Sequence, residues 1–85
     1  MKLSWTDLAW ESYLYWQATD KSTLKKINAL IKDIQRTPFE GIGKPEPLKF
    51  EFAGKWSRRI SGEHRLVYEI VDGELIILQC RYHYA

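Results

Sequence analysis

The chain has 85 residues, enough for one domain and too few for a second hydrophobic core, so we expect a single domain covering residues 1–85. Hydrophobic residues make up 45% of the chain, which excludes a disordered protein, and the net charge of +2 is too small to indicate nucleic-acid binding by itself. With no membrane-length apolar stretch, no signal-peptide pattern and a single cysteine, the expected location is the cytoplasm.

Two helices are expected in the first half of the chain, after a short strand at Leu3–Trp5. Thr6 is a candidate N-cap for the first helix, whose apolar face is predicted from the spacing of Trp10, Tyr13, Leu14 and Gln17. Asp20 is a candidate N-cap for the second helix, and Thr37-Pro38 ends it. The second helix carries an apolar stripe made of Leu24, Ile27, Leu30, Ile31 and Ile34.

A loop without regular structure is expected at residues 38–47, which hold three prolines and two glycines. Three strands then follow at about 55–60, 64–71 and 74–83, with a turn at Ser61–Glu63 and a hairpin turn at Asp72-Gly73. The predicted fold class is α+β, with two N-terminal helices packed on one face of a mainly antiparallel sheet.

The alternation of side chains along a strand predicts which residues face the helices. In the middle strand this set is Leu66, Tyr68 and Ile70, and in the last strand it is Ile76, Leu78, Cys80 and Tyr82. Leu75 and Ile77 then fall on the solvent face, and the four tryptophans are expected mostly in the core. The same count gathers four cationic or titratable side chains on the solvent face, namely Arg59, Arg65, Arg81 and His83.

Charge is unevenly distributed, because residues 41–66 contain six basic residues against three acidic ones. Arginine binds phosphate through a planar fork of donors, and histidine exchanges a proton near neutral pH. A sheet face that collects several arginines and a histidine is therefore suited to hold a phosphate and to perform acid–base chemistry on it. This pattern predicts a small RNA-cleaving enzyme.

Five segments are informative together, namely Arg36–Gly41, Gly43–Lys49, Gly54–Ile60, Glu63–Tyr68 and Cys80–Tyr84. They resemble the YoeB/Txe toxins, which belong to the RelE-like superfamily of bacterial type II toxin–antitoxin systems. The resemblance extends to Trp16, Thr19-Asp20 and Lys25–Asn28, and so covers nearly the whole chain in order. The sequence departs from the family pattern at Phe50-Glu51-Phe52, which is more apolar than expected, and at Ala85, which extends the usual end.

The resemblance implies a microbial-ribonuclease-like sheet and ribosome-dependent cleavage of mRNA in the decoding site, with no metal and no other cofactor. It implies the catalytic residues Glu46, Arg65 and His83, and the substrate- and phosphate-binding residues Lys49, Arg59 and Tyr84. The implied partners are mRNA on the ribosome, an antitoxin of the YefM/Axe type, and a second copy of the chain in a homodimer.

RNA carries its own nucleophile, the 2′-hydroxyl, so the protein has to supply a base, an acid and charge stabilisation. In this scheme Glu46 takes the 2′-hydroxyl proton, His83 protonates the departing 5′-oxygen, and Arg65 stabilises the charged transition state. Arg59 and Lys49 assist Arg65, and Tyr84 bonds a phosphate oxygen or stacks on a base.

Each site residue also has a simpler interpretation. Glu46 is then a solvated loop residue, His83 lies in a frayed end, and Arg65 forms a cross-strand pair with Glu51 or Glu63. Arg58 and Arg81 are expected to be structural or ribosome-facing, and His64 to be a surface residue. The two histidines and one cysteine lack the spacing of a zinc site.

Two rival functions stay open at this point. One is a toxin of the same fold that inhibits a protein target, such as gyrase, by binding without cleaving RNA. The other is a non-enzymatic RNA-binding module. The joint presence of Glu46, Arg65 and His83 favours the enzyme, because a protein that only binds has no need of an acid–base pair.

Overall fold

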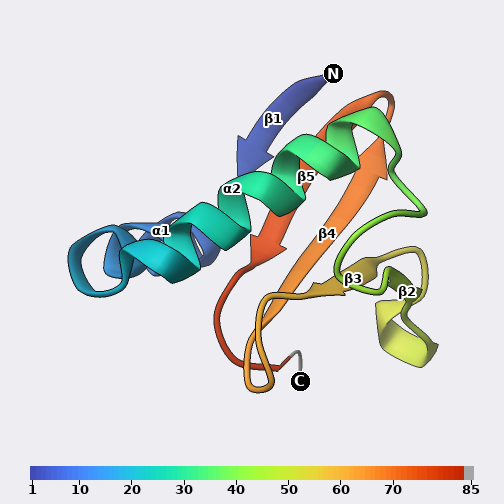
Figure 1. The fold of residues 1–85 in the computed structure, drawn as a ribbon. Coiled ribbons are helices and arrows are strands. Elements are labelled where there is room, and N and C mark those ends of the chain that lie inside the picture. Colours follow the sequence, from blue (N-terminus) through green and yellow to red (C-terminus); the bar gives the residue numbers. More distant parts are fainter. Residues whose placement is uncertain (84–85) are drawn as a thin grey trace.

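The computed structural model describes residues 1–83 and contains two helices and a five-stranded mixed sheet (Figure 1). The elements are β1 (Lys2–Trp5), α1 (Asp7–Thr19), α2 (Lys21–Arg36), β2 (Glu46–Pro47), β3 (Trp56–Arg59), β4 (Arg65–Val71) and β5 (Glu74–Gln79). A single 3-10 turn at Phe50–Phe52 lies between β2 and β3. The strand order is β1-β5-β4-β3-β2, with β1 parallel to β5 and the other pairs antiparallel. The predicted α+β fold is confirmed.

Both predicted N-caps are confirmed. The Thr6 hydroxyl accepts a hydrogen bond from the Ala9 amide, and the Asp20 carboxylate accepts from the amides of Ser22 and Thr23. These side chains bind amide groups that have no partner within the helix, and so fix where α1 and α2 begin. Because its carboxylate accepts these bonds and those of the Ser22 and Thr23 hydroxyls, Asp20 has a pKa below its usual range.

The apolar stripe of α2 packs on the sheet as predicted, with Ile27, Leu30, Ile31 and Ile34 all buried. The predicted face of α1 is wrong. Its buried residues are Ala9, Ser12 and Trp16, whereas Trp10 is 46% exposed. Apolar side chains occur on every side of α1, so their spacing alone does not show which side is buried. The small side chains of Ala9 and Ser12 lie on the buried side. Neither helix is long and apolar enough to cross a membrane.

The predicted facing of the last strand is also wrong. Leu75 and Ile77 are fully buried against the helices, opposite Ile70 and Tyr68 of β4. The register shifts at Val67/Tyr68, and β5 is apolar on both faces from Leu75 to Leu78, which removes the alternation on which the prediction depended. The strand ends at Gln79, so the expected continuation to residue 83 is not formed.

Cys80 follows directly after β5 and is buried, as its neighbours in the sequence suggested. Its thiol donates a hydrogen bond to the Ala9 carbonyl oxygen over 3.5 Å. Burial raises the pKa of this thiol to about 12, because the charged thiolate would lie in an apolar interior. Cys80 therefore acts as a small core side chain.

The loop between α2 and β3 is held by one fully buried arginine, Arg58. Its guanidinium donates hydrogen bonds to the Asp33 carboxylate at 2.5 Å and to the backbone carbonyl oxygens of Thr37, Glu40 and Ile42 at 2.7–3.0 Å. These bonds, with that from the Ile42 amide to Asp33, keep the pKa of the Asp33 carboxyl below its usual value. The structural role expected for Arg58 is confirmed.

The same loop corrects the prediction that residues 38–47 contain no regular structure. Its last part, Glu46–Pro47, pairs with β3 as the short edge strand β2. Gly41 has φ +128° and lies directly against the Asp33 carboxylate, where a Cβ atom would collide with that carboxylate and crowd Arg58. The buried ion pair, rather than proline rings alone, sets the path of the chain toward β2.

Candidate active site

The sheet face opposite the helices carries most of the candidate residues. On this outer face Glu46 of β2 lies opposite Ser57 of β3, Ser57 opposite Val67 of β4, and Val67 opposite Gln79 of β5. These four residues form one row across four strands. Glu46 stands exposed at the β2 edge of the row, and Gln79 ends it on β5.

Arg59 and Arg65 face each other across β3 and β4, two residues along from that row. The Nη1 group of Arg65 donates to the carbonyl oxygens of Ser61 at 2.7 Å and His64 at 3.1 Å, which holds the guanidinium over its own turn. Within residues 1–83, its Nε and Nη2 groups have no acceptor, and Arg65 forms no ion pair with Glu51 or Glu63. Two donors of a phosphate-binding fork are thus left free in the described part of the chain.

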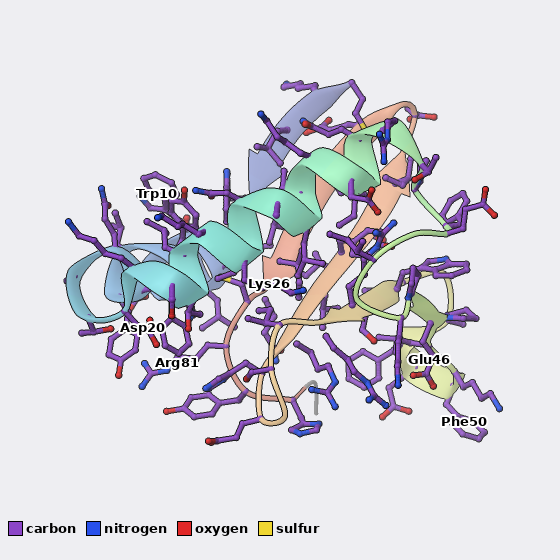
Figure 2. The ribbon with its side chains drawn as sticks, in the orientation of Figure 1. Trp10, Asp20, Lys26, Glu46, Phe50 and Arg81 are labelled. Carbon is purple, nitrogen blue, oxygen red and sulfur yellow. The ribbon has the colours of Figure 1, made fainter. Side chains whose placement is uncertain are left out.

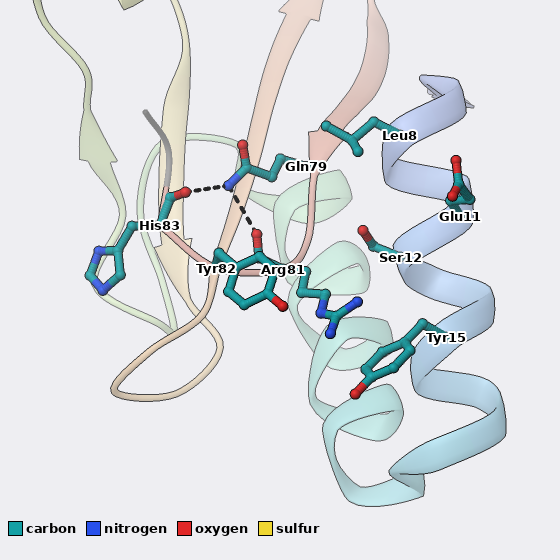
Figure 3. Close-up of a pocket in the computed structure, with 8 residues that line it drawn as sticks. All are labelled: Leu8, Glu11, Ser12, Tyr15, Gln79, Arg81, Tyr82 and His83. Carbon is teal, nitrogen blue, oxygen red and sulfur yellow. Dashed lines mark hydrogen bonds between the residues drawn. The ribbon is translucent and has the colours of Figure 1, made fainter.

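The segment after β5 is fastened to the start of β4. The Arg65 amide donates to the Tyr82 carbonyl oxygen at 2.9 Å, and the Tyr82 amide donates to His64 Nδ1 at 2.7 Å. The Gln79 side-chain amide donates to the carbonyl oxygens of Arg81 at 3.0 Å and His83 at 2.7 Å (Figure 3). Although His83 lies on no strand, its carbonyl oxygen is bonded by Gln79 and the neighbouring Tyr82 is bonded to the start of β4. These bonds argue against the alternative of a frayed end for the segment up to His83.

His64 and Gln79 are the two residues of this site that sequence reasoning missed. His64 was expected at the surface, but it is half-buried, with its ring 4.9 Å from that of Trp16 and 5.6 Å from that of Tyr82. A polar residue at the end of an apolar strand, as Gln79 is, was the available signal for a hydrogen bond to backbone. No sequence pattern indicated that His64 Nδ1 accepts a hydrogen bond from the Tyr82 amide or that the His64 ring packs on Trp16.

Arg81 does not join the outer face, contrary to the prediction from alternation. Its guanidinium lies over the ring of Tyr15 at 3.7 Å and beside that of Tyr82 at 4.7 Å, facing α1. Figure 3 shows Arg81 directed toward Tyr15, whereas the His83 ring points away from α1. The backbone leaves the strand after Gln79, so the two-residue alternation no longer applies to Arg81 and His83.

The candidate residues do not share one enclosed cavity. Glu46 and Lys49 line a hollow of about 390 Å³, Arg59 and Arg65 line one of about 460 Å³, and His83 borders a third of about 400 Å³. The candidate site is thus open and divided among three hollows, and α1 also lines the one at His83 while Lys26 of α2 also lines the one at Arg59 and Arg65. Tyr84 lies outside the described residues.

The hollow at Arg59 and Arg65 is strongly cationic, since Lys26 of α2 and Lys44 also line it and no carboxylate does. Such a surface attracts phosphate groups. Elsewhere, within residues 1–83, no three histidine, cysteine, aspartate or glutamate side chains come together as metal ligands would.

Comparison with known proteins identifies the family. The model of the YoeB-like toxins of bacterial type II toxin–antitoxin systems matches residues 5–84. The chain belongs to this family. The YoeB toxin of Escherichia coli K12 is 64% identical over 84 residues, covering 99% of this chain and all of that protein. The resemblance stated from the sequence segments is thereby confirmed.

Solved structures of YoeB toxins share the fold over nearly the whole chain. The structure described as a YoeB/ParE toxin from Agrobacterium tumefaciens has a TM-score of 0.97 at 53% identity, covering 99% of this chain and all of that one. Two structures from Staphylococcus aureus, a heterotetrameric YoeB–YefM toxin–antitoxin complex and a YoeB dimer, each have a TM-score of 0.92 at 48% identity and cover 99% and 98% of the two chains. This YoeB-like toxin is thus a toxin of a type II toxin–antitoxin system with the RelE-like fold.

Proposed function

We propose that this YoeB-like toxin is an endoribonuclease that cleaves mRNA on the ribosome. The observation that carries the proposal is the arrangement on the outer face. Arg59 and Arg65 face each other, Glu46 lies in the neighbouring row, and His83 is held beside Arg65 by bonds to Tyr82 and Gln79. A base, an acid and a phosphate-binding pair are the groups that metal-free RNA cleavage uses.

The spacing on the sheet suits a nucleotide bound between the acid–base groups. Glu46 and Arg65 are separated by two strand spacings, each about 4.8 Å, and by two residues along the strands. Their long side chains can therefore approach a phosphodiester from different sides instead of pairing with each other. This separation supports a role for Glu46 at the 2′-hydroxyl and for Arg65 at the phosphate.

In the proposed reaction, Glu46 removes the 2′-hydroxyl proton as the 2′-oxygen forms a bond to phosphorus. The bond from phosphorus to the 5′-oxygen breaks, and protonated His83 gives its proton to that oxygen. Arg65 binds the phosphate oxygens while their charge increases, and Arg59 and Lys49 add to the cationic surroundings. The products are a 2′,3′-cyclic phosphate and a 5′-hydroxyl end. Tyr84 is proposed as a further phosphate or base contact.

An open face explains why the ribosome is needed. None of the three hollows encloses a substrate, so free RNA would have to reach the in-line geometry with little help from the protein. A ribosome that holds the mRNA in a fixed conformation supplies this positioning, which is typically worth several kcal/mol. We therefore expect cleavage to be at least about a hundredfold faster on ribosomes than on naked RNA. Action on ribosomes would accordingly take place in the cytoplasm, the location we propose.

A YefM-like antitoxin is the proposed inhibitor, and a homodimer is the proposed state of the free toxin. The Staphylococcus aureus relatives, described as a YoeB–YefM complex and as a YoeB dimer, support both. The cationic hollow at Arg59 and Arg65 favours an acidic segment of the antitoxin, which would cover the outer face and block RNA.

Single-turnover cleavage on programmed ribosomes, with mapping of the mRNA ends, tests the function. Wild-type toxin should produce 5′-hydroxyl ends within the decoding site, and His83→Gln and Glu46→Gln should each lower the rate by about 10²–10⁴-fold. Glu40→Gln is the matched control, because the Glu40 carboxylate is exposed, lines none of the three hollows and should have no effect. Growth arrest without any mRNA cleavage would favour a toxin that inhibits a protein by binding.

A further inference from the structure

Phe50 is the most exposed large apolar side chain of the described residues, at 88%. It lies at the start of the 3-10 turn, where its ring projects outward in the same part of the molecule as Glu46 (Figure 2). Within residues 1–83 its ring contacts no other aromatic ring. Single exposed apolar residues are common, so the exposure gains meaning only from the backbone and the surroundings.

The backbone of Phe50 is strained as well as exposed. Its φ of 58° lies in the left-handed region, which is unfavourable for a bulky side chain. Hydrogen bonds of the turn hold this backbone in place. The Ala53 amide donates to the Phe50 carbonyl oxygen at 3.0 Å, and the Leu48 amide donates to the Lys55 carbonyl oxygen at 2.9 Å. Leu48 is buried and anchors the turn to the protein. Strain of this kind concentrates at functional sites, and core packing does not account for it here.

The surroundings of Phe50 match the parts of a nucleotide. Residues 46–52 line one hollow of about 390 Å³, which includes the exposed Glu46 carboxylate and the exposed Lys49 ammonium. A carboxylate at the 2′-hydroxyl, a cation at a phosphate and an aromatic ring at a base would together bind one nucleotide. The ring is the only one of these three groups without a role in the proposed reaction.

We propose that Phe50 is a stacking platform for a nucleobase of the mRNA next to the cleaved phosphodiester. The proposal rests on the proposed function and adds a substrate-positioning contact to it. Stacking on an aromatic ring tolerates all four bases, because each base has a π face. Phe50 therefore strengthens binding of the mRNA and imposes little base preference.

The test measures binding to ribosomes programmed with a synthetic mRNA whose 2′-hydroxyls in the decoding site are methylated, so that no cleavage step enters. Phe50→Ala should weaken binding by roughly 5- to 150-fold, the range typical of one stacked base, and Phe50→Trp should restore it. Phe39→Ala is the matched control, since Phe39 is another exposed phenylalanine, at 52%, but its ring packs on that of Trp56 at 4.9 Å and does not line this hollow.

Abasic mRNAs identify the contact. When each base near the cleavage point is removed in turn, the effect of Phe50→Ala should disappear for one mRNA and persist for the others. If Phe50→Ala weakens binding equally on every abasic mRNA, the proposal is overturned and Phe50 contacts a ribosomal surface instead. If Phe50→Ala does not weaken binding to any mRNA, the proposal is overturned as well.

Two further measurements separate other causes of failure. Phe50→Gly relieves the positive φ and should unfold at higher denaturant than wild type while binding as weakly as Phe50→Ala, which excludes unfolding as the cause of weak binding. Cleavage of unmethylated mRNA by wild type tests the proposed function by itself. Binding that depends on Phe50 without any cleavage would leave the stacking contact intact and reject the ribonuclease.

Discussion

Arg58 and Arg59 are neighbours in the chain and have opposite surroundings. The Arg58 side chain is fully buried on the helix-facing side of β3, where it binds Asp33 and three backbone carbonyl oxygens. The Arg59 side chain is exposed on the outer face, opposite Arg65. One arginine shapes the loop that leads to β2, and the other stands ready for an anion. A strand thus assigns structural and functional roles to identical residues through its alternation alone.

The largest expected effect is a difference in stability between protein variants that lack Arg58 and variants that lack Arg59. Arg58→Leu should lower the free energy of unfolding by about 3–5 kcal/mol, because it leaves the Asp33 carboxylate buried without its partner and releases the loop. Arg59→Leu should change it by about 0.5 kcal/mol or less. Urea unfolding of both variants checks this prediction, and equal losses would contradict it.

Loss of the Arg65 side chain on the outer face should lower activity while leaving the fold intact. Arg65→Ala should slow single-turnover cleavage on ribosomes by about 10²–10³-fold, the usual loss for one group that stabilises transition-state charge. Far-UV circular dichroism should match wild type, since the Arg65 side chain is only partly buried. Cleavage within twofold of wild type would exclude Arg65 from the phosphate site.

A smaller effect is expected at the residue that holds the C-terminal segment. Gln79→Leu removes the two hydrogen bonds to the carbonyl oxygens of Arg81 and His83, and should slow cleavage by about ten- to a hundredfold through misplacement of the His83 ring. Single-turnover rates against pH would check this. A lower rate with an unchanged pH profile fits misplacement, whereas the loss of the acid limb would mean that Gln79 also affects protonation.

The smallest effect is a dependence of stability on acid at Asp33, the partner of the buried Arg58. The hydrogen bond from Arg58 holds the pKa of Asp33 below its unfolded value of about 3.9. Its contribution to stability is therefore present above that pH and is lost as the pH falls through the folded pKa. Asp33→Asn should be less stable than wild type at pH 6, and the difference should shrink toward pH 3. Urea titrations at both values measure it, and a constant difference would contradict the linkage.

Sequence reasoning found the elements whose signals are local. The caps Thr6 and Asp20 and the stripe of α2 were predictable because a side-chain oxygen or a 3.6-residue spacing acts within one helix. It failed where a segment is apolar throughout and where the interacting residues are far apart in the sequence. The run Leu75–Leu78 offers no alternation, and the partner of Arg58 lies 25 residues away at Asp33.

The candidate site divides in the same way. The exposed faces of Glu46, Arg59 and Arg65 follow from strand alternation once the sheet is formed. The position of His83 does not, because it depends on bonds that Gln79 and Arg65 make to backbone atoms after the strand has ended. The polar Gln79 at the end of an apolar strand signals a bond to backbone, but nothing in the sequence identifies which carbonyl oxygens it binds.

The hydrogen bonds from Arg58 to the loop leave part of the loop sequence free to change, in evolution or in redesign. They end on the carbonyl oxygens of Thr37, Glu40 and Ile42, which every amino acid supplies. The side chains of Glu40 and Ile42 are exposed and are therefore free to vary while the path of the loop stays the same. Related toxins could alter the outer surface of this loop, and with it whatever the loop touches, without disturbing the strand that presents Glu46.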